Sequence, residues 1–291
     1  MTQAPVLGFI GLGVMGSGMC RNVVTKHPAR VHVFDMVPAA IAEQVAAGAV
    51  AASSVAQMAA QADVVFLSLP GGKQVATVSA EIAAQGRAGT VVVDLSTTGV
   101  AEARAVAATL AAKGLDFADA PVARTREAAQ AGTLSIMVGA SDALFDRIAP
   151  LLGYMGRDVT HCGAVGCGQV VKLINNTLLF EQVAALAEMM VVAERAGVTP
   201  DKLIEAVSLG SGDSFALRNH ARKAMAPRHF PEKAFPSTYA LKDLGYAIEL
   251  AGQMGVAPRL AQLAGEYYQG AVDAGIGDKY FPAIIETIGK A

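Results

Sequence analysis

A short apolar run, Val6–Ile10, leads directly into the segment Gly11–Gly16, which has the pattern G-x-G-x-x-G. Gly11 allows a tight turn, Gly13 lets backbone amides approach a pyrophosphate, and Gly16 lets the next helix pack closely on the strand. The start of that helix would present free N–H groups and a partial positive charge to the phosphates. Alone, such a triplet is a weak signal, but a strand before it and a helix after it predict a dinucleotide-binding unit.

An acidic residue follows at the spacing that this unit requires. The apolar run Val31–Phe34 ends at Asp35, about 20 residues after the glycine pattern. A carboxylate there accepts hydrogen bonds from an adenosine ribose and repels a 2′-phosphate, which favours NAD over NADP. Two alternatives stay open: Arg30 could bend toward a phosphate, and Asp35 could be a turn residue before Pro38.

Short apolar runs alternate with Ala-rich stretches as far as residue 162. Besides the first, the runs are 31–34, 49–51, 64–69, 91–95, 115–118, 134–138 and 159–161. Strands without polar alternation are covered on both faces, which is typical of a parallel sheet. Alternating strands and helices predict an α/β fold, a doubly wound Rossmann-type sheet, over residues 1–163.

The pattern becomes helical after residue 163. No strand breaker interrupts Cys167–Gly197, which predicts one helix of about 30 residues that ends at Gly197, shortly before Pro200. Further helices are expected at 201–209, 238–254, 258–274 and 282–289, and nothing there reads as a strand. Residues 164–291 are therefore expected to form an all-α domain.

Composition excludes several functions. The 291 residues carry a formal net charge of −2, so no field would attract nucleic acid. Residues 1–20 are uncharged, but glycines interrupt them and no basic residue precedes them, so we expect neither a membrane span nor a secretory signal. Three cysteines make no disulfide framework, which indicates a cytoplasmic protein. His161, Cys162 and Cys167 lack an evident fourth ligand, and no metal is expected.

Lys172 is a cation near the start of the long apolar helix. Asn175 and Asn176 lie three and four residues on and share its helix face. Polar groups on a buried helix cost stability unless they are satisfied or used, and burial readily converts a lysine to a neutral amine that can take a proton. Spacing alone leaves a second interpretation open, in which Lys172 reaches solvent beside a bonded Asn pair.

Several motifs, in this order, resemble the β-hydroxyacid dehydrogenases, the family of 3-hydroxyisobutyrate dehydrogenase and tartronate semialdehyde reductase. They are Gly8–Gly16, Asp94-Leu95-Ser96-Thr97, Asp119-Ala120-Pro121-Val122, Gly132-Thr133-Leu134, Gly166-x-Gly168 through Lys172 to Asn176, and Lys242-Asp243-Leu244. The resemblance covers nearly the whole chain, and it implies that residues 164–291 serve substrate binding and oligomerisation. It implies an enzyme that transfers hydride between a nicotinamide and a small acid bearing a hydroxyl or aldehyde, and assembly as a homodimer or homotetramer.

The resemblance also implies site residues. Lys172 matches the general acid/base, and Asn176 matches a residue that orients it and the substrate. Cofactor contacts are implied for Gly11, Leu12, Gly13, Val14, Met15, Gly16, Asp35, Met36, Leu69, Pro70, Gln74, Thr97 and Lys242. Substrate contacts are implied for Ala123, Arg124, Thr125, Asn175, Asn176 and Leu179.

One departure from the family pattern bears on the substrate. After Asp-Ala-Pro-Val the family usually has Ser-Gly-Gly, whereas this chain has Ala123-Arg124-Thr125. A guanidinium pairs well with oxyanions, and the Arg-Thr pair resembles the sulfolactaldehyde reductase branch, in which the arginine meets a sulfonate. We therefore expect sulfolactaldehyde or 2,3-dihydroxypropanesulfonate as the favoured substrate.

Three alternatives to the sulfonate enzyme stay open. One is an enzyme for a carboxylate substrate, such as a 3-hydroxyisobutyrate dehydrogenase or a tartronate or succinate semialdehyde reductase. Another is a non-catalytic NAD sensor, which would have no use for Lys172. The third is an imine-reducing enzyme, which would carry a different proton donor at that position.

Overall fold

The computed structural model describes residues 4–232 and 234–289 of the chain. The chain separates into two compact units, Met1–Lys172 and Leu173–Ala291. The division falls inside one helix, α8 (Cys167–Arg195), whose first residues belong to the N-terminal unit.

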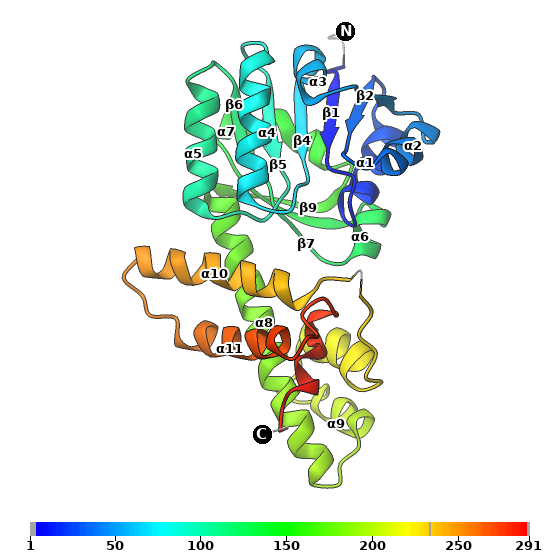
Figure 1. Cartoon of the computed structure of the whole chain (residues 1–291), viewed down its shortest axis with the longest axis vertical. Coiled ribbons are helices and arrows are strands. Elements are labelled where there is room, and N and C mark those ends of the chain that lie inside the picture. The colour runs from blue at the N-terminus through cyan, green and yellow to red at the C-terminus, as the bar shows by residue number, and fades with distance from the viewer. Residues whose placement is uncertain (1–3, 233, 290–291) are drawn as a thin grey trace. The chain divides into compact units, whose positions relative to one another are not determined.

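The N-terminal unit is built on a nine-stranded sheet (Figure 1). Its strands are β1 (Leu7–Ile10), β2 (Val31–Phe34), β3 (Val50–Ala51), β4 (Val64–Leu67), β5 (Val91–Asp94), β6 (Asp116–Asp119), β7 (Val122–Ala123), β8 (Leu134–Gly139) and β9 (Gly156–Gly163). The sheet order is β3-β2-β1-β4-β5-β6-β8-β7, with β9 paired to β8. The chain builds outward from β1 in one direction and from β4 in the other, so the predicted doubly wound fold is confirmed.

Strand direction changes at the end of this sheet. The pairs among β1 to β6 are parallel, whereas β8 runs antiparallel to β6 and β7. The short strand β7 was not expected, and the uniformly parallel sheet expected through 134–138 and 159–161 was wrong at β8. An apolar run shows that a strand is buried on both faces but carries no information about its direction.

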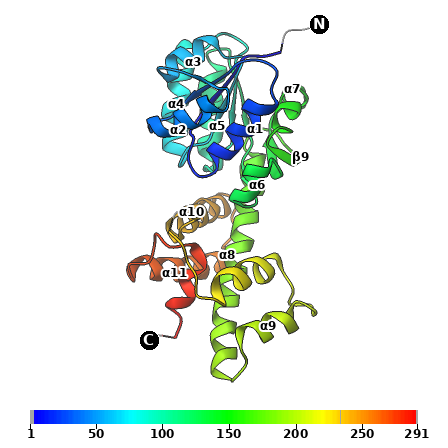
Figure 2. The same ribbon diagram turned by 90° about the vertical axis from the view of Figure 1, so that its right-hand side faces the viewer.

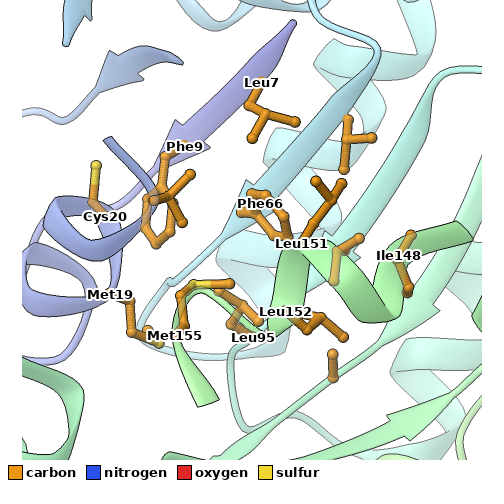
Figure 3. Packing of buried hydrophobic residues seen from close by; sticks show 14 of the residues in the cluster. Leu7, Phe9, Met19, Cys20, Phe66, Leu95, Ile148, Leu151, Leu152 and Met155 are labelled. Carbon is orange, nitrogen blue, oxygen red and sulfur yellow. The ribbon is translucent and has the colours of Figure 1, made fainter. Parts of the chain in front are cut away.

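Helices cover both faces of the sheet. They are α1 (Gly16–Lys26), α2 (Pro38–Ala46), α3 (Val55–Gln61), α4 (Gly72–Gln85), α5 (Val100–Ala111), α6 (Arg126–Ala131) and α7 (Asp142–Leu152). Successive strand side chains point to opposite faces. Phe66 accordingly packs with α1 and α7 (Figure 3). Its neighbours Val65 and Leu67 pack with residues of α3, α4 and α5, the helices that cover the other face of the sheet (Figures 1 and 2).

The C-terminal unit is helical, as expected. After α8 it contains α9 (Pro200–Val207), the π-helix η1 (Ala216–Met225), α10 (Ser237–Gln253), α11 (Arg259–Asp273) and the 3₁₀ helix η2 (Phe281–Glu286). Phe180 of α8, Tyr268 of α11 and Phe281 of η2 meet edge-to-face or tilted in its core. η1 was not predicted, and the segment expected as a helix at 282–289 is a shorter 3₁₀ turn.

The α8 helix is long and apolar enough to cross a membrane by length and composition alone, with a mean hydropathy of 1.3 over its most apolar window. A core helix of a soluble protein meets the same criterion, so a single helix of this kind is weak evidence for a span. Polar side chains near its start belong to the candidate site.

Candidate active site

The glycine turn joins β1 to α1 at the carboxyl edge of the sheet, where β1 lies between β2 and β4. Gly11 has φ +96°, and a Cβ there would collide with the backbone oxygen of Ser68. A Cβ at Gly16 would collide with the backbone oxygen of Gly11. Gly13, in contrast, faces open space with no atom within 4 Å of a Cβ. The turn therefore has its expected conformation and leaves room for a ligand at its middle glycine.

Asp35 lies beside this turn at the end of β2. Its two carboxylate oxygens accept hydrogen bonds from the backbone N–H groups of Leu12, at 2.6 Å, and Val37, at 2.8 Å. Met36, next to it, is 92% exposed. A half-buried carboxylate beside an open glycine turn fits the ribose and pyrophosphate of a dinucleotide.

The loops after β4 and β5 meet next to the glycine turn. The backbone N–H of Leu69 donates to the hydroxyl of Ser96 at 2.9 Å, and the N–H of Ser96 donates to Asp94 at 2.9 Å. These bonds place Leu69 and Pro70 beside the loop that carries Thr97. Gln74 lies exposed on the first turn of α4.

The start of α8 is held by a buried carboxylate at the end of β6. Asp119 is fully buried and accepts hydrogen bonds from the N–H groups of Gly166, at 2.6 Å, and Gln169, at 2.8 Å. Burial raises the pKa of Asp119, and these backbone hydrogen bonds oppose that rise. A Cβ at Gly168 would lie 2.8 Å from the Asp119 carboxylate, so the glycine permits this close contact.

Lys172 and Asn176 are both buried on one face of α8, with 7% and 5% of their surfaces exposed. Asn176 donates to Asp243 of α10 at 2.7 Å and accepts a hydrogen bond from Asn175 at 3.1 Å. Leu179 is half-buried one turn further on. The two hydrogen bonds fix the orientation of the Asn176 side-chain amide.

Lys242 of α10 lies next to the Asn176–Asp243 pair in the helical unit. Its Nζ lies 3.3 Å from the Asp243 carboxylate and over the rings of Tyr239 and Tyr246, at 5.8 and 5.5 Å from their centroids. Sequence reasoning quoted Asp243 in a motif but gave it no role. The sequence feature that could have identified Asp243 is its position next to Lys242, which was expected to contact the cofactor.

Arg124 has a partner inside the protein. Its guanidinium donates to Asp158 of β9 at 2.7 Å and to the backbone oxygen of Thr133 at 3.0 Å. Its φ of +91° lies in the region that favours glycine, which is the residue the family pattern has there. Thr125 accepts a hydrogen bond from the N–H of Ala128 and caps α6. The expected contact of Arg124 with the substrate stays a prediction.

The described part of the chain contains no group of three His, Cys, Asp or Glu side chains placed to hold a metal ion. The ring of His161 stacks on Phe145 and lies 2.9 Å from the backbone oxygen of Ala140. These contacts indicate a structural role for His161.

Two family models match the chain. The NAD-binding domain of 6-phosphogluconate dehydrogenase matches residues 6–163, and the NAD-binding domain of NADP-dependent 3-hydroxyisobutyrate dehydrogenase matches residues 166–288. The 2-(hydroxymethyl)glutarate dehydrogenase of Eubacterium barkeri is 36% identical over 290 residues, which cover 99% of this chain and 96% of that protein. The chain belongs to the β-hydroxyacid dehydrogenase family.

A solved structure of a family member agrees with this assignment. The 3-hydroxyisobutyrate dehydrogenase of Mycobacterium tuberculosis, solved with L-serine, superposes with a TM-score of 0.90 and 32% identity, covering 99% of this chain and 100% of the other. An imine reductase from Pseudomonas sp. has a TM-score of 0.65 at 17% identity, covering 98% and 100%, and shares the fold alone.

The family assignment confirms the coarse functional predictions. The chain is an NAD(P)-dependent oxidoreductase of CH–OH groups, its cofactor is a nicotinamide dinucleotide, and its partner is a small-molecule substrate. The sequence therefore predicted the family, the fold and the class of reaction.

Proposed function

We propose that this enzyme interconverts a small β-hydroxy acid and its aldehyde, with Lys172 as the group that moves the proton. The observation that supports this proposal is the burial of Lys172 and Asn176 on one face of α8. Burial in general favours the neutral form of an amine, and a neutral amine can accept the proton of a substrate hydroxyl.

Each polar group of the site has one task in this proposal. NAD, when bound, supplies the hydride acceptor for oxidation and, once reduced, the donor for the reverse reaction. The Lys172 amine takes the hydroxyl proton in oxidation, and its ammonium returns a proton to the carbonyl oxygen in reduction. Asn176, oriented by Asp243, holds the reacting oxygen, and Asn175 contacts the acid end.

A carboxylate substrate with a hydroxymethyl group fits the relatives. The names 2-(hydroxymethyl)glutarate and 3-hydroxyisobutyrate both denote acids that carry a hydroxymethyl group on the carbon next to a carboxylate. L-serine, which is present in the Mycobacterium tuberculosis complex, has the same arrangement. The Arg124–Asp158 pair supports this substrate class over sulfolactaldehyde, because the guanidinium charge already has a counter-charge. The sulfonate, which the sequence analysis favoured because of the Arg124-Thr125 pair, becomes our second candidate.

A lysine substitution tests the proposal. Lys172→Met keeps an unbranched side chain of similar length, and we expect kcat for 3-hydroxyisobutyrate and 2-(hydroxymethyl)glutarate to fall at least about 100-fold. The dissociation constant for NADH should stay within a few-fold. Lys202→Met, at an exposed lysine of α9, is the control and should change neither quantity. Unchanged turnover in Lys172→Met would refute the mechanism.

We further propose a cytoplasmic homodimer or homotetramer. Ile174, Leu178, Met189 and Val192 are apolar residues of α8 that are 52–56% exposed, and burying them would favour association. Light scattering on the purified protein tests this, and a monomer at micromolar concentration would contradict it.

A further inference from the structure

The side-chain amide of Gln169 bridges the two peptide groups on either side of Thr97. Its Oε1 accepts a hydrogen bond from the N–H of Thr98 at 3.1 Å, and its Nε2 donates to the backbone oxygen of Ser96 at 2.8 Å. Gln169 is fully buried, and Ser96 and Thr98 are 5% and 1% exposed. Water cannot replace these bonds, so their loss would leave buried polar groups unpaired.

The loop that carries Thr97 is also hydrogen-bonded to the loop after β4 at the edge of the sheet. Ser96 accepts a hydrogen bond from Leu69 in the loop after β4, and donates its own N–H to Asp94. The backbone N–H of Gln169 donates to Asp119 at the end of β6. One buried network therefore joins the ends of β4, β5 and β6 to the first turn of α8.

Gln169 is also placed to affect Lys172. The two residues lie three positions apart on α8, less than one helical turn, so the position of one largely sets the position of the other. The hydrogen bonds of Gln169 thereby fix the position of the loop carrying Thr97 relative to Lys172 through a short, rigid stretch of helix.

We propose that Gln169 is a positioning residue that holds the Thr97 loop in register with Lys172. This inference rests on the proposed function of Lys172. Because hydride and proton transfer depend on the placement of reacting groups to within about 1 Å, loss of the bridge should slow the chemical step more than it weakens binding. Gln169 itself need not touch the substrate.

Gln169→Met tests the inference, because methionine keeps the length and flexibility of the side chain but removes both hydrogen bonds. We expect kcat to fall about 10- to 100-fold, with KM for the acid and the dissociation constant for NADH within about 3-fold. The primary isotope effect on kcat with 4-deuterated NADH, in the reducing direction, should increase. In the cofactor-free protein, amide exchange over residues 95–99 should become faster.

Asn22→Leu is a matched control in the same unit. The buried Asn22 amide donates to the backbone oxygens of Gly18, Ala129 and Gln130, each at 3.0 Å, and has no part in the network. It should lower the melting temperature to a similar extent while kcat and exchange over residues 95–99 stay near wild type. The control separates lost positioning from general loss of stability.

The outcomes distinguish this inference from the proposed function. Wild-type kcat and exchange in Gln169→Met, with turnover abolished in Lys172→Met, would overturn the inference alone. Full turnover in Lys172→Met would overturn the proposed function and the inference with it. If Gln169→Met does not fold, Gln169→Glu retains an acceptor for Thr98 but lacks the donor to Ser96, and wild-type kcat in that variant would overturn the inference.

Discussion

The side-chain amide of Asn176 on α8 donates a 2.7 Å hydrogen bond to the carboxylate of Asp243 on α10, and both side chains are buried. This bond decides which way the amide points: its nitrogen faces Asp243, and its oxygen accepts from Asn175. Lys242, next in sequence to Asp243, shares the same carboxylate at 3.3 Å. Asp243 thus orients two of the residues that sequence analysis had assigned to the site.

Removing the Asp243 carboxylate should weaken both stability and activity. In Asp243→Ala, the buried Asn176 amide loses a charged acceptor, which costs about 1.5–3 kcal/mol of unfolding free energy. We expect a lower kcat and a lower midpoint in urea denaturation, with Asp243→Asn intermediate because it still offers an acceptor oxygen. Asp201→Ala, at an exposed residue of α9, is the control. Wild-type kcat in Asp243→Ala would show that the orientation of Asn176 is unimportant.

Two glycines of the turn should respond differently to the same added methyl group. Gly13→Ala meets no protein atom, so the melting temperature should hardly change, but the methyl group enters the space assigned to the cofactor and NADH binding should weaken at least about 10-fold. Gly16→Ala collides with the backbone oxygen of Gly11 and should lower the melting temperature itself. Calorimetry with NADH titration checks both, and tight NADH binding by Gly13→Ala would contradict the assigned site.

The Arg124–Asp158 pair should govern the choice between carboxylate and sulfonate substrates. We expect the wild type to prefer 3-hydroxyisobutyrate over 2,3-dihydroxypropanesulfonate, because the guanidinium is already paired. Asp158→Asn frees it and should raise kcat/KM for the sulfonate relative to the carboxylate by up to about 5-fold, since an exposed pair is worth up to about 1 kcal/mol. In Arg124→Ser this gain should vanish. A wild type that prefers the sulfonate would reverse the substrate proposal and leave the family assignment intact.

Acid should destabilise the helical unit through His220. Burial, with a smaller effect of Lys223, lowers the pKa of His220 to about 4, and its Nδ1 lies 2.7 Å from the Tyr280 hydroxyl. The unfolded chain binds a proton near pH 6.5, so stability is full above that pH and is lost as pH falls toward 4, by roughly 2 kcal/mol at pH 5.

Thermal unfolding at pH 7 and pH 5 measures this effect. His220→Gln should lose less stability than the wild type between the two values, whereas His229→Gln, at an exposed histidine, should lose as much as the wild type. Equal losses in His220→Gln and the wild type would contradict the assignment.

The local part of this structure could be predicted from the sequence. The glycine turn, Asp35 after β2 and the 29-residue helix α8 depend on backbone conformation and on hydrophobic periodicity among near neighbours, which the chain carries in its order of residues. The motifs likewise indicated the family, because their residue types and order are specific in combination.

The tertiary structure alone decided how distant side chains pair. Gln169 reaches Ser96 and Thr98, Arg124 reaches Asp158, and Asn176 reaches Asp243 across long stretches of sequence. The reversal at β8 has the same origin, since pairing partner and direction are properties of the assembled sheet. A periodic pattern records which face of an element is buried, but a hydrogen bond between two elements depends on where both lie in space, and that is settled only when the chain packs.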